Sequence, residues 1–265
     1  MFLATNAGPF ELREVSLAAD GLPSLRVLHI SDIHFAPGQR NKAAFLRELA
    51  QTSPDLVVNT GDNLGHKRSI NPLLDAIEPL LGFPGVFVNG SNDYFAPKLK
   101  NPARYLLGPS KQDSEPSTLD TERMTREFEG AGWQNLNNRS AIIRLGDAEV
   151  SFAGLDDPHI GRDEPATLAN KSAQIGVVHA PYLKSLEALT TTGAKLLFAG
   201  HTHGGQLCLP GGKALVTNCD LPTAQASGLS EYGGAKLHVS AGMGCSIYAP
   251  LRLFCAPSAT LVNVN

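Results

Sequence analysis

Short apolar runs alternate with amphipathic stretches along the first third of the chain. The runs 25–30, 55–59 and 85–89 are apolar and rich in β-branched residues, a pattern typical of buried strands. Apolar residues recur at helical spacing in 39–52 and again in 69–81. The pattern therefore predicts a succession of strand–helix steps, with a cluster of polar residues directly after each strand.

The second half of the chain favours β structure. The runs 140–145 and 149–154 flank Gly146-Asp147, a dipeptide that favours a tight hairpin turn. Further strands are predicted at 175–178, 196–199, 214–217, 236–239 and 260–264, and helices over 118–129 and 181–189. Strands and helices in this alternation are typical of an α/β fold.

One segment, 96–117, interrupts this rhythm. It contains four prolines and is too long for an ordinary connection, so we interpret it as a lid or an inserted loop. A length of 265 residues fits one large domain, and no convincing linker is present. We therefore expect a single domain over 1–265.

The composition narrows the class of protein. With 42% hydrophobic and 18% charged residues, the chain is typical of a soluble globular protein, and we expect it to be cytoplasmic. A net charge of −3 provides no global field for nucleic acid, so we expect no nucleic-acid partner. No apolar run reaches the about 18–20 residues of a membrane helix. The four cysteines form no CxxC pair and are predicted to be buried free thiols.

Five polar clusters follow the predicted strands and carry the candidate chemistry. They are Asp32-Ile33-His34, Gly61-Asp62-Asn63, Gly90-Ser91-Asn92-Asp93, His179 and Gly200-His201-Thr202-His203. Residues two apart on an extended segment point the same way, so Asp32 and His34 can share one metal ion, and His201 and His203 can face one cavity. Carboxylate and imidazole ligands without thiolate suit Mn, Fe, Zn or Mg. The sequence contains no GxSxG motif and no Cys next to a His, so it does not favour a serine or thiol hydrolase.

Taken in order, these clusters resemble the calcineurin-like metallophosphoesterase superfamily. The family pattern is DxH, GDxx, GNH[D/E], a lone His and GHxH, and this chain has DIH, GDN, GSND, VVHAP and GHTHGGQ. The tail over 242–254 is also similar to a branch of the family with a late GxGxS and PxR segment. The resemblance covers about residues 25–264. It implies two mixed β-sheets packed as a sandwich and flanked by helices, in four layers.

The resemblance also implies a binuclear metal-dependent phosphoesterase, with a metal-bound hydroxide that attacks phosphorus. The implied ligands are Asp62 as the bridge, Asp32, His34 and His203 on one ion, and His179 and His201 on the other. The expected substrate is a small phosphoester, more specifically a phosphodiester or phospholipid-like group, and peripheral membrane association is left open. The alternative is a non-catalytic scaffold of the same fold that binds proteins.

This chain departs from the family at one motif. Where the family has Gly-Asn-His, this sequence has Gly90-Ser91-Asn92. An ungapped comparison places Ser91 at the ligand position and Asn92 at the acid position, whereas a shifted loop would let Asn92 be a ligand. We favour Asn92 lining the site in either role.

The usual imidazole acid is therefore missing from that motif. His66, four residues past Asp62, and His159 are the two candidates to supply it. Asn63, Ser91 and Asp157 are predicted to contact the substrate.

Overall fold

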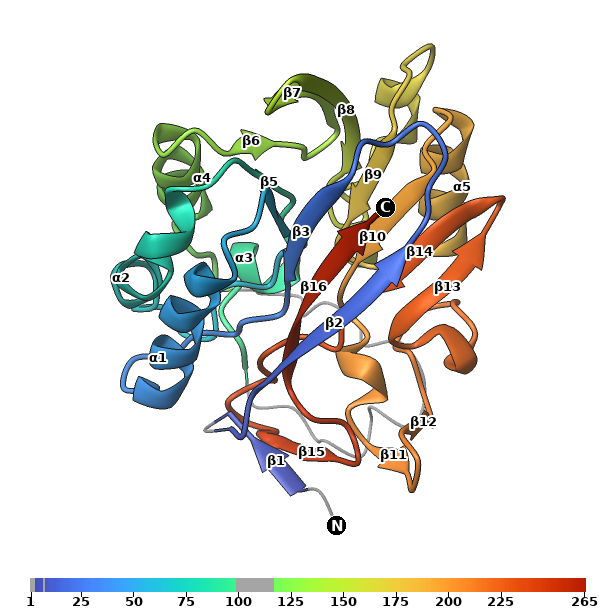
Figure 1. The fold of residues 1–265 in the computed structure, drawn as a ribbon. Coiled ribbons are helices and arrows are strands. Elements are labelled where there is room, and N and C mark those ends of the chain that lie inside the picture. The colour runs from blue at the N-terminus through green and yellow to red at the C-terminus, as the bar shows by residue number, and fades with distance from the viewer. Residues whose placement is uncertain (1–2, 7, 99–116) are drawn as a thin grey trace.

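Two six-stranded sheets pack face to face, and helices cover both outer faces (Figure 1). The computed structural model describes residues 3–6, 8–98 and 117–265. The order of layers is helices, sheet, sheet, helix, so the predicted four-layer α/β sandwich is confirmed. The insertion predicted at 96–117 lies almost wholly outside the described residues. Like the single-domain organisation of 1–265, it stays a prediction.

The first sheet contains the strands of the predicted strand–helix steps. Its strands, in order across the sheet, are β2 (Glu11–Leu17), β16 (Ser258–Val264), β3 (Leu25–Ile30), β4 (Leu56–Asn59), β5 (Gly85–Phe87) and β6 (Gln134–Asn135). β3, β4, β5 and β6 are parallel, whereas β16 is antiparallel to β3. The carboxyl ends of β3, β4 and β5 therefore lie at one end of the molecule.

The second sheet is parallel at its centre and antiparallel at both edges. Its strands, in order, are β13 (Gly228–Tyr232), β14 (Ala235–Val239), β10 (Leu196–Ala199), β9 (Ile175–Val178), β8 (Ala148–Leu155) and β7 (Arg139–Leu145). β7 and β8 form the predicted hairpin around Gly146, whose φ of +60° suits a residue without a Cβ. β9 and β10 are parallel, so their carboxyl ends also share one end of the sheet.

The core between the sheets explains why the central strands are continuously apolar. Val27 and Val58 of the first sheet and Phe152, Val177 and Phe198 of the second are fully buried in one cluster. A strand buried on both faces does not alternate apolar and polar residues. The edge strand β2 does alternate, and the sequence analysis did not predict it.

Helices complete the outer layers. The α-helices are α1 (Arg40–Glu48), α2 (Ile70–Leu81), α3 (Ser91–Tyr94), α4 (Thr121–Gly130) and α5 (Leu183–Thr191). Shorter 3₁₀ turns are η1 (Leu49–Thr52), η3 (Pro158–Ile160), η4 (Pro165–Leu168), η5 (His203–Gly205) and η6 (Thr223–Gln225). α1, α2 and α4 pack on the first sheet, whereas α5 packs on the second. The helix predicted from 118 begins at Thr121, because the side chain of Asp120 accepts the backbone N–H of Arg123.

Two small sheets lie at the end of the molecule to which β3 and β4 point (Figure 1). They are β1 (Leu3–Thr5) with β15 (Leu251–Leu253), and β11 (Cys208–Leu209) with β12 (Lys213–Ala214). The strand predicted over 214–217 was wrong beyond Ala214, because the Thr217 hydroxyl bonds the loop carbonyls of Cys219 and Leu221.

The cysteines are free thiols, as predicted, with Cys208, Cys245 and Cys255 buried and Cys219 half-buried. Within the described ranges, no helix is both long enough and apolar enough to cross a bilayer.

Candidate metal centre

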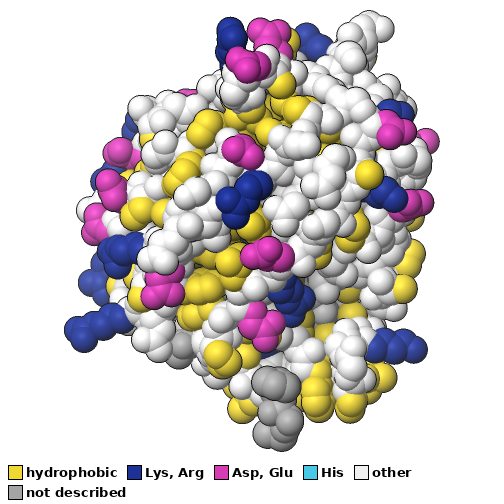
Figure 2. All heavy atoms as spheres, in the orientation of Figure 1, with side chains coloured by type: hydrophobic (Ala, Val, Ile, Leu, Met, Phe, Trp, Pro, Cys, Tyr) yellow, Lys and Arg dark blue, Asp and Glu magenta, His cyan; other side chains and the backbone are white. Residues whose placement is uncertain are grey.

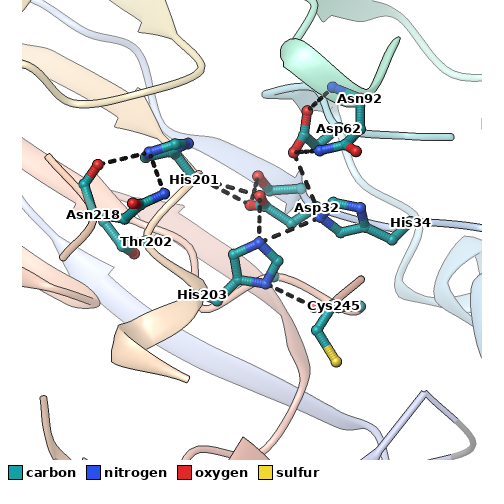
Figure 3. Close-up of polar contacts among 12 residues, drawn as sticks. Asp32, His34, Asp62, Asn92, His201, Thr202, His203, Asn218 and Cys245 are labelled. Atoms are coloured by element: carbon teal, nitrogen blue, oxygen red, sulfur yellow. Dashed lines mark hydrogen bonds and ion pairs between the residues drawn. The ribbon is translucent and has the colours of Figure 1, made fainter. Parts of the chain in front are cut away.

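The predicted ligands converge from both sheets. Asp32 and His34 follow β3, Asp62 follows β4, and the histidines of GHTH follow β10. The ligand atoms of Asp32, His34, Asp62 and His203 all lie within 4.8 Å of one another (Figure 3). His34 Nε2 is 3.3 Å from His203 Nε2 and 3.5 Å from Asp62 Oδ2, and His203 Nε2 is 3.5 Å from Asp32 Oδ1. Two imidazoles and two carboxylates in this arrangement can hold one divalent ion.

Hydrogen bonds from the opposite ring nitrogens orient two of the histidines. His203 Nδ1 lies 2.8 Å from the Gly244 carbonyl, and His179 Nδ1 lies 2.7 Å from the Thr60 carbonyl. A ring whose Nδ1–H donates to a carbonyl presents Nε2 as the ligand nitrogen. His179 Nε2 is buried without a hydrogen-bond partner and lies 3.6 Å from Asp62 Oδ1. Because buried polar atoms are nearly always satisfied, this orphaned nitrogen fits a metal ligand.

His201 is held differently. Its backbone N–H donates to both oxygens of Asp32, at 3.2 and 3.0 Å. Its Nε2 lies 3.2 Å from the Asn218 carbonyl, which leaves Nδ1 as the nitrogen able to bind an ion. The His201 and His179 rings are in edge contact, with centroids 5.2 Å apart.

Asp62 lies between the two groups of histidines. Its Oδ2 faces His34 and its Oδ1 faces His179. Asn92 donates its backbone N–H to Asp62 Oδ1 at 2.7 Å and its side-chain amide to Oδ2 at 2.8 Å. Asn92 therefore orients this carboxylate, and its role as a ligand stays a prediction. Ser91 Oγ lies 3.5 Å from the same amide nitrogen.

Burial sets the charge state of the imidazoles near Asp32. Burial lowers the pKa of His34 to about 4, and burial with a neighbouring imidazole holds the pKa of His203 well below its usual range. Burial raises the pKa of Asp32 to about 6. These imidazoles are thus neutral near pH 7, the form in which they bind metal ions.

At His179, nearby carboxylates rather than burial set the charge state. Burial disfavours the imidazolium, but the carboxylates of Asp62, Asp157 and Asp32 outweigh it and raise the pKa of His179 to about 9. Burial alone would raise the pKa of Asp62 as well. The nearby His179 and His34 and the two bonds from Asn92 instead hold it well below its usual range.

The backbone is strained at most of the predicted ligands. Positive φ angles occur at Asp32 (+47°), His34 (+44°), Asp62 (+55°), His201 (+70°) and His203 (+50°). Left-handed conformations of non-glycine residues cost on the order of 1 kcal/mol each, and they persist where the surroundings over-determine them. Such clustering is typical of functional sites.

Asp93 supports the loops that carry the centre, and no role was predicted for it from the sequence. Its carboxylate accepts the backbone N–H groups of Asp62 at 2.8 Å, Asn63 at 2.7 Å and Gly90 at 3.0 Å. It therefore ties the loop after β4 to the loop after β5. Its position within the GSND motif was the signal that could have identified it.

Two fully buried basic side chains, Lys42 and Arg252, support the ligand loops, and neither was predicted from the sequence. Lys42 Nζ donates to the carbonyl of Ile33, between Asp32 and His34, at 2.7 Å. Arg252 donates to the carbonyls of Ala241 (2.7 Å), His203 (3.2 Å) and Gly244. A lysine within the apolar pattern of 39–52 was a readable signal. The partners of Arg252 could not be read, because they are up to 49 residues away in the chain.

The remaining predicted site residues differ in placement. The His159 ring lies 4.6 Å from the His201 ring, and Asp157 is buried with Oδ2 unpartnered. His66 instead accepts the Arg68 backbone N–H through Nδ1 at 3.1 Å. Asn63 is fully buried and bonds Asn59 and Asp93. The structure thus brings His159 and Asp157 to the centre and uses Asn63 in the loop scaffold, while their roles toward substrate stay predictions.

Comparison with known proteins identifies the family. The family profile "Calcineurin-like phosphoesterase" matches residues 25–205. Phosphodiesterase YaeI of Escherichia coli is 27% identical over 270 residues, covering 97% of this chain and 89% of YaeI. The uncharacterized metallophosphoesterase YkuE of Bacillus subtilis is 24% identical, covering 94% and 82%. A transmembrane protein with metallophosphoesterase domain from Danio rerio is 25% identical, covering 77% of this chain and 47% of that protein.

Among solved structures, TT1561 of Thermus thermophilus superposes with a TM-score of 0.48 at 13% identity, covering 83% of this chain and 90% of that one. The family match, the order of motifs and the cluster of metal-binding side chains agree. The chain belongs to the calcineurin-like phosphoesterase family, whose members are phosphoester hydrolases that normally bind divalent metal ions.

Proposed function

We propose that this protein hydrolyses phosphodiesters with two divalent ions bound on either side of Asp62. The observation that carries the proposal is the cluster of Asp32, His34, Asp62 and His203 within 4.8 Å. His34 and His203 come from loops 169 residues apart, and each of the four residues has a left-handed backbone. Four polar groups brought together at this cost, three of them buried and His203 half-buried, favour a retained metal site over the non-catalytic scaffold.

Two ion positions follow from the orientation of the side chains. We define the first position by Asp32, His34 and His203 with Asp62 Oδ2, and the second by His179 Nε2 and His201 Nδ1 with Asp62 Oδ1. Divalent ions held there would neutralise phosphoryl oxygens and lower the pKa of water toward neutrality. The identity of the ions, Mn, Fe, Zn or Mg, is a matter for measurement.

The chain's own residues orient the ligands and supply a proton. Asn92 fixes both oxygens of Asp62, and Thr60 and Gly244 fix the ring planes of His179 and His203. The half-buried imidazole of His159, beside His201, is the better placed of the two candidate acids for a leaving oxygen. The name of the relative YaeI, a phosphodiesterase, supports a diester over a monoester.

The test loads the purified protein with Mn or Zn and assays bis(p-nitrophenyl) phosphate and p-nitrophenyl phosphate. We expect two ions per chain by elemental analysis and a preference for the diester. Protein that holds two ions and hydrolyses neither ester would contradict the enzymatic proposal, and a single ion per chain would contradict the binuclear one.

A second arm of the test separates the candidate acids. On a diester with a poor leaving group, His159→Ala should lower kcat about a hundredfold, whereas His66→Ala should leave it unchanged. On the activated nitrophenyl diester, both variants should match the wild type because that leaving group needs no proton. The reverse result on the poor leaving group would assign the proton to His66.

A further inference from the structure

An apolar surface covers the small sheets next to the metal centre. β1 and β15 pair with Leu3 opposite Leu253 and Thr5 opposite Leu251, so these leucines share one face. Leu207 bridges Leu253 and extends this face to β11. We define the apolar end face by its exposed members, Leu3 (51% exposed), Leu209 (47%), Leu215 (48%), Tyr248 (43%) and Leu251 (50%). Figure 2 shows hydrophobic side chains gathered along this lower edge of the molecule.

The segments that form this face carry no acidic side chain. Segments 1–10, 188–219 and 232–265 contribute β1, β11, β12 and β15, and they contain no aspartate or glutamate, although the chain has 25. Lys213 is exposed opposite Leu209 in the β11–β12 pair. Leucines beside an exposed lysine, with no carboxylate in the same segments, suit a surface that is apolar inside and anionic outside.

A cavity adjoins the face on the side of β1. It has a volume of about 460 Å³ and is lined by Thr5 and Asn6, by Arg40 at the start of α1, and by Pro250 beside Leu251. Arg40 is exposed, and the helix start contributes the positive end of its dipole. The cavity can therefore accept an anionic head group at the edge of the apolar end face.

The opposite side of the same strand faces the metal centre. Arg252 lies between Leu251 and Leu253 in β15, and its side chain turns inward to the carbonyls of His203 and Ala241. The apolar end face is thus separated from a predicted metal ligand by one buried side chain. A surface that rests on this face therefore lies across β15 from the metal centre.

We propose that the apolar end face docks on an anionic lipid bilayer, with Arg40 and Lys213 at the level of the phosphates. The exposed leucines enter the boundary between head groups and acyl chains, where their burial stabilises binding. Docking there would hold the metal centre close to the bilayer. Its use on lipid phosphodiesters rests on the proposed function, whereas docking itself does not.

The experiment measures co-sedimentation of the full chain with vesicles of phosphatidylcholine, alone and in an equimolar mixture with phosphatidylglycerol. We expect binding to the mixed vesicles that weakens with salt. Leu251→Ser and Leu209→Ser should each weaken binding about fivefold. Each replaces a leucine side chain whose exposed half would be buried on docking. Lys213→Glu should weaken binding to the mixed vesicles alone.

Ile142→Ser is the matched control, since Ile142 is 69% exposed on β7, at the far edge of the second sheet. It should bind like the wild type. Activity of the leucine variants on a water-soluble diester should be unchanged, which shows that they are folded. The docking proposal would be overturned if the wild type bound neither kind of vesicle, or if the leucine variants bound as tightly as the wild type.

A dimer in solution that the leucine variants dissociate would assign the face to a second copy and also overturn it. Vesicle binding by a protein that hydrolyses no phosphoester would leave docking intact and refute the proposed function instead.

Discussion

The two ion positions that share Asp62 differ in how far the folded chain prepares them. At the first position, the ligand atoms converge within 4.8 Å and the imidazoles of His34 and His203 are neutral near pH 7. At the second, His201 is held by Asn218 and His179 retains a proton in the field of three carboxylates. The folded chain therefore presents the first position ready to bind an ion, whereas His179 must lose a proton before the second position can bind one. We expect the first position to bind its ion more tightly.

Replacing the carboxylate that the positions share should have the largest effect. Asp62→Asn keeps the shape of the side chain but removes the charge that faces both His34 and His179. We expect loss of both ions by elemental analysis and a fall in kcat/KM of at least about a thousandfold. Asp75→Asn, at an exposed position on α2, is the control and should change neither. Retention of both ions by Asp62→Asn would refute a bridging role.

Replacing one histidine at each position should separate the two. His203→Ala removes a ligand of the prepared position, and His201→Ala removes one of the other. Calorimetric titration should show the tighter ion weakened about a hundredfold in the first variant and only the weaker ion affected in the second. Identical titrations for both variants would show that the positions do not bind independently.

Arg252 braces only the first position, so its replacement should act there. Arg252→Lys keeps the charge but loses the planar fork that reaches the carbonyls of Ala241, His203 and Gly244. We expect a loss of about 2 kcal/mol in the free energy of unfolding and a roughly tenfold weaker first ion. The exposed Arg126→Lys is the control. A loss of stability with unchanged affinity for the ion would make Arg252 a purely structural residue.

The central strands and the ligand positions could be predicted because one physical rule governs both. Parallel strands buried on both faces appear as continuous apolar runs, and polar residues directly after them must lie at one end of the sheet. β3, β4, β9 and β10 follow this rule. The edge strand β2 does not follow this rule, because alternate residues of Glu11–Leu17 are exposed to solvent.

What the sequence could not reveal depends on contacts between distant segments. The left-handed backbone at Asp32 and Asp62 has only a weak signature in residue type, because aspartate adopts that conformation more often than most residues but glycine is its usual marker. The sequence also could not predict that the two ion positions differ in the charge state of their histidines. His179 and His203 look alike in the sequence, and only the packed carboxylates around His179 give it the opposite charge preference.

That charge preference predicts how the two positions respond to pH. Burial disfavours the charged form of His179, yet its three carboxylate neighbours raise its pKa to about 9, so below that pH a proton occupies the ring and must leave before Nε2 binds an ion. Affinity at the second position should therefore rise about tenfold per pH unit from pH 7 and level off near pH 9.

The first position has no such proton to lose. The pKa values of His34, about 4, and Asp32, about 6, leave its affinity flat above pH 7, with a decline only below about pH 6. Calorimetric titrations in buffers of different ionisation enthalpy measure both the affinities and the proton released. His179→Gln should abolish the slope and spare the first ion. Equal slopes for the two ions would mean that the carboxylates around His179 do not set the difference between the positions.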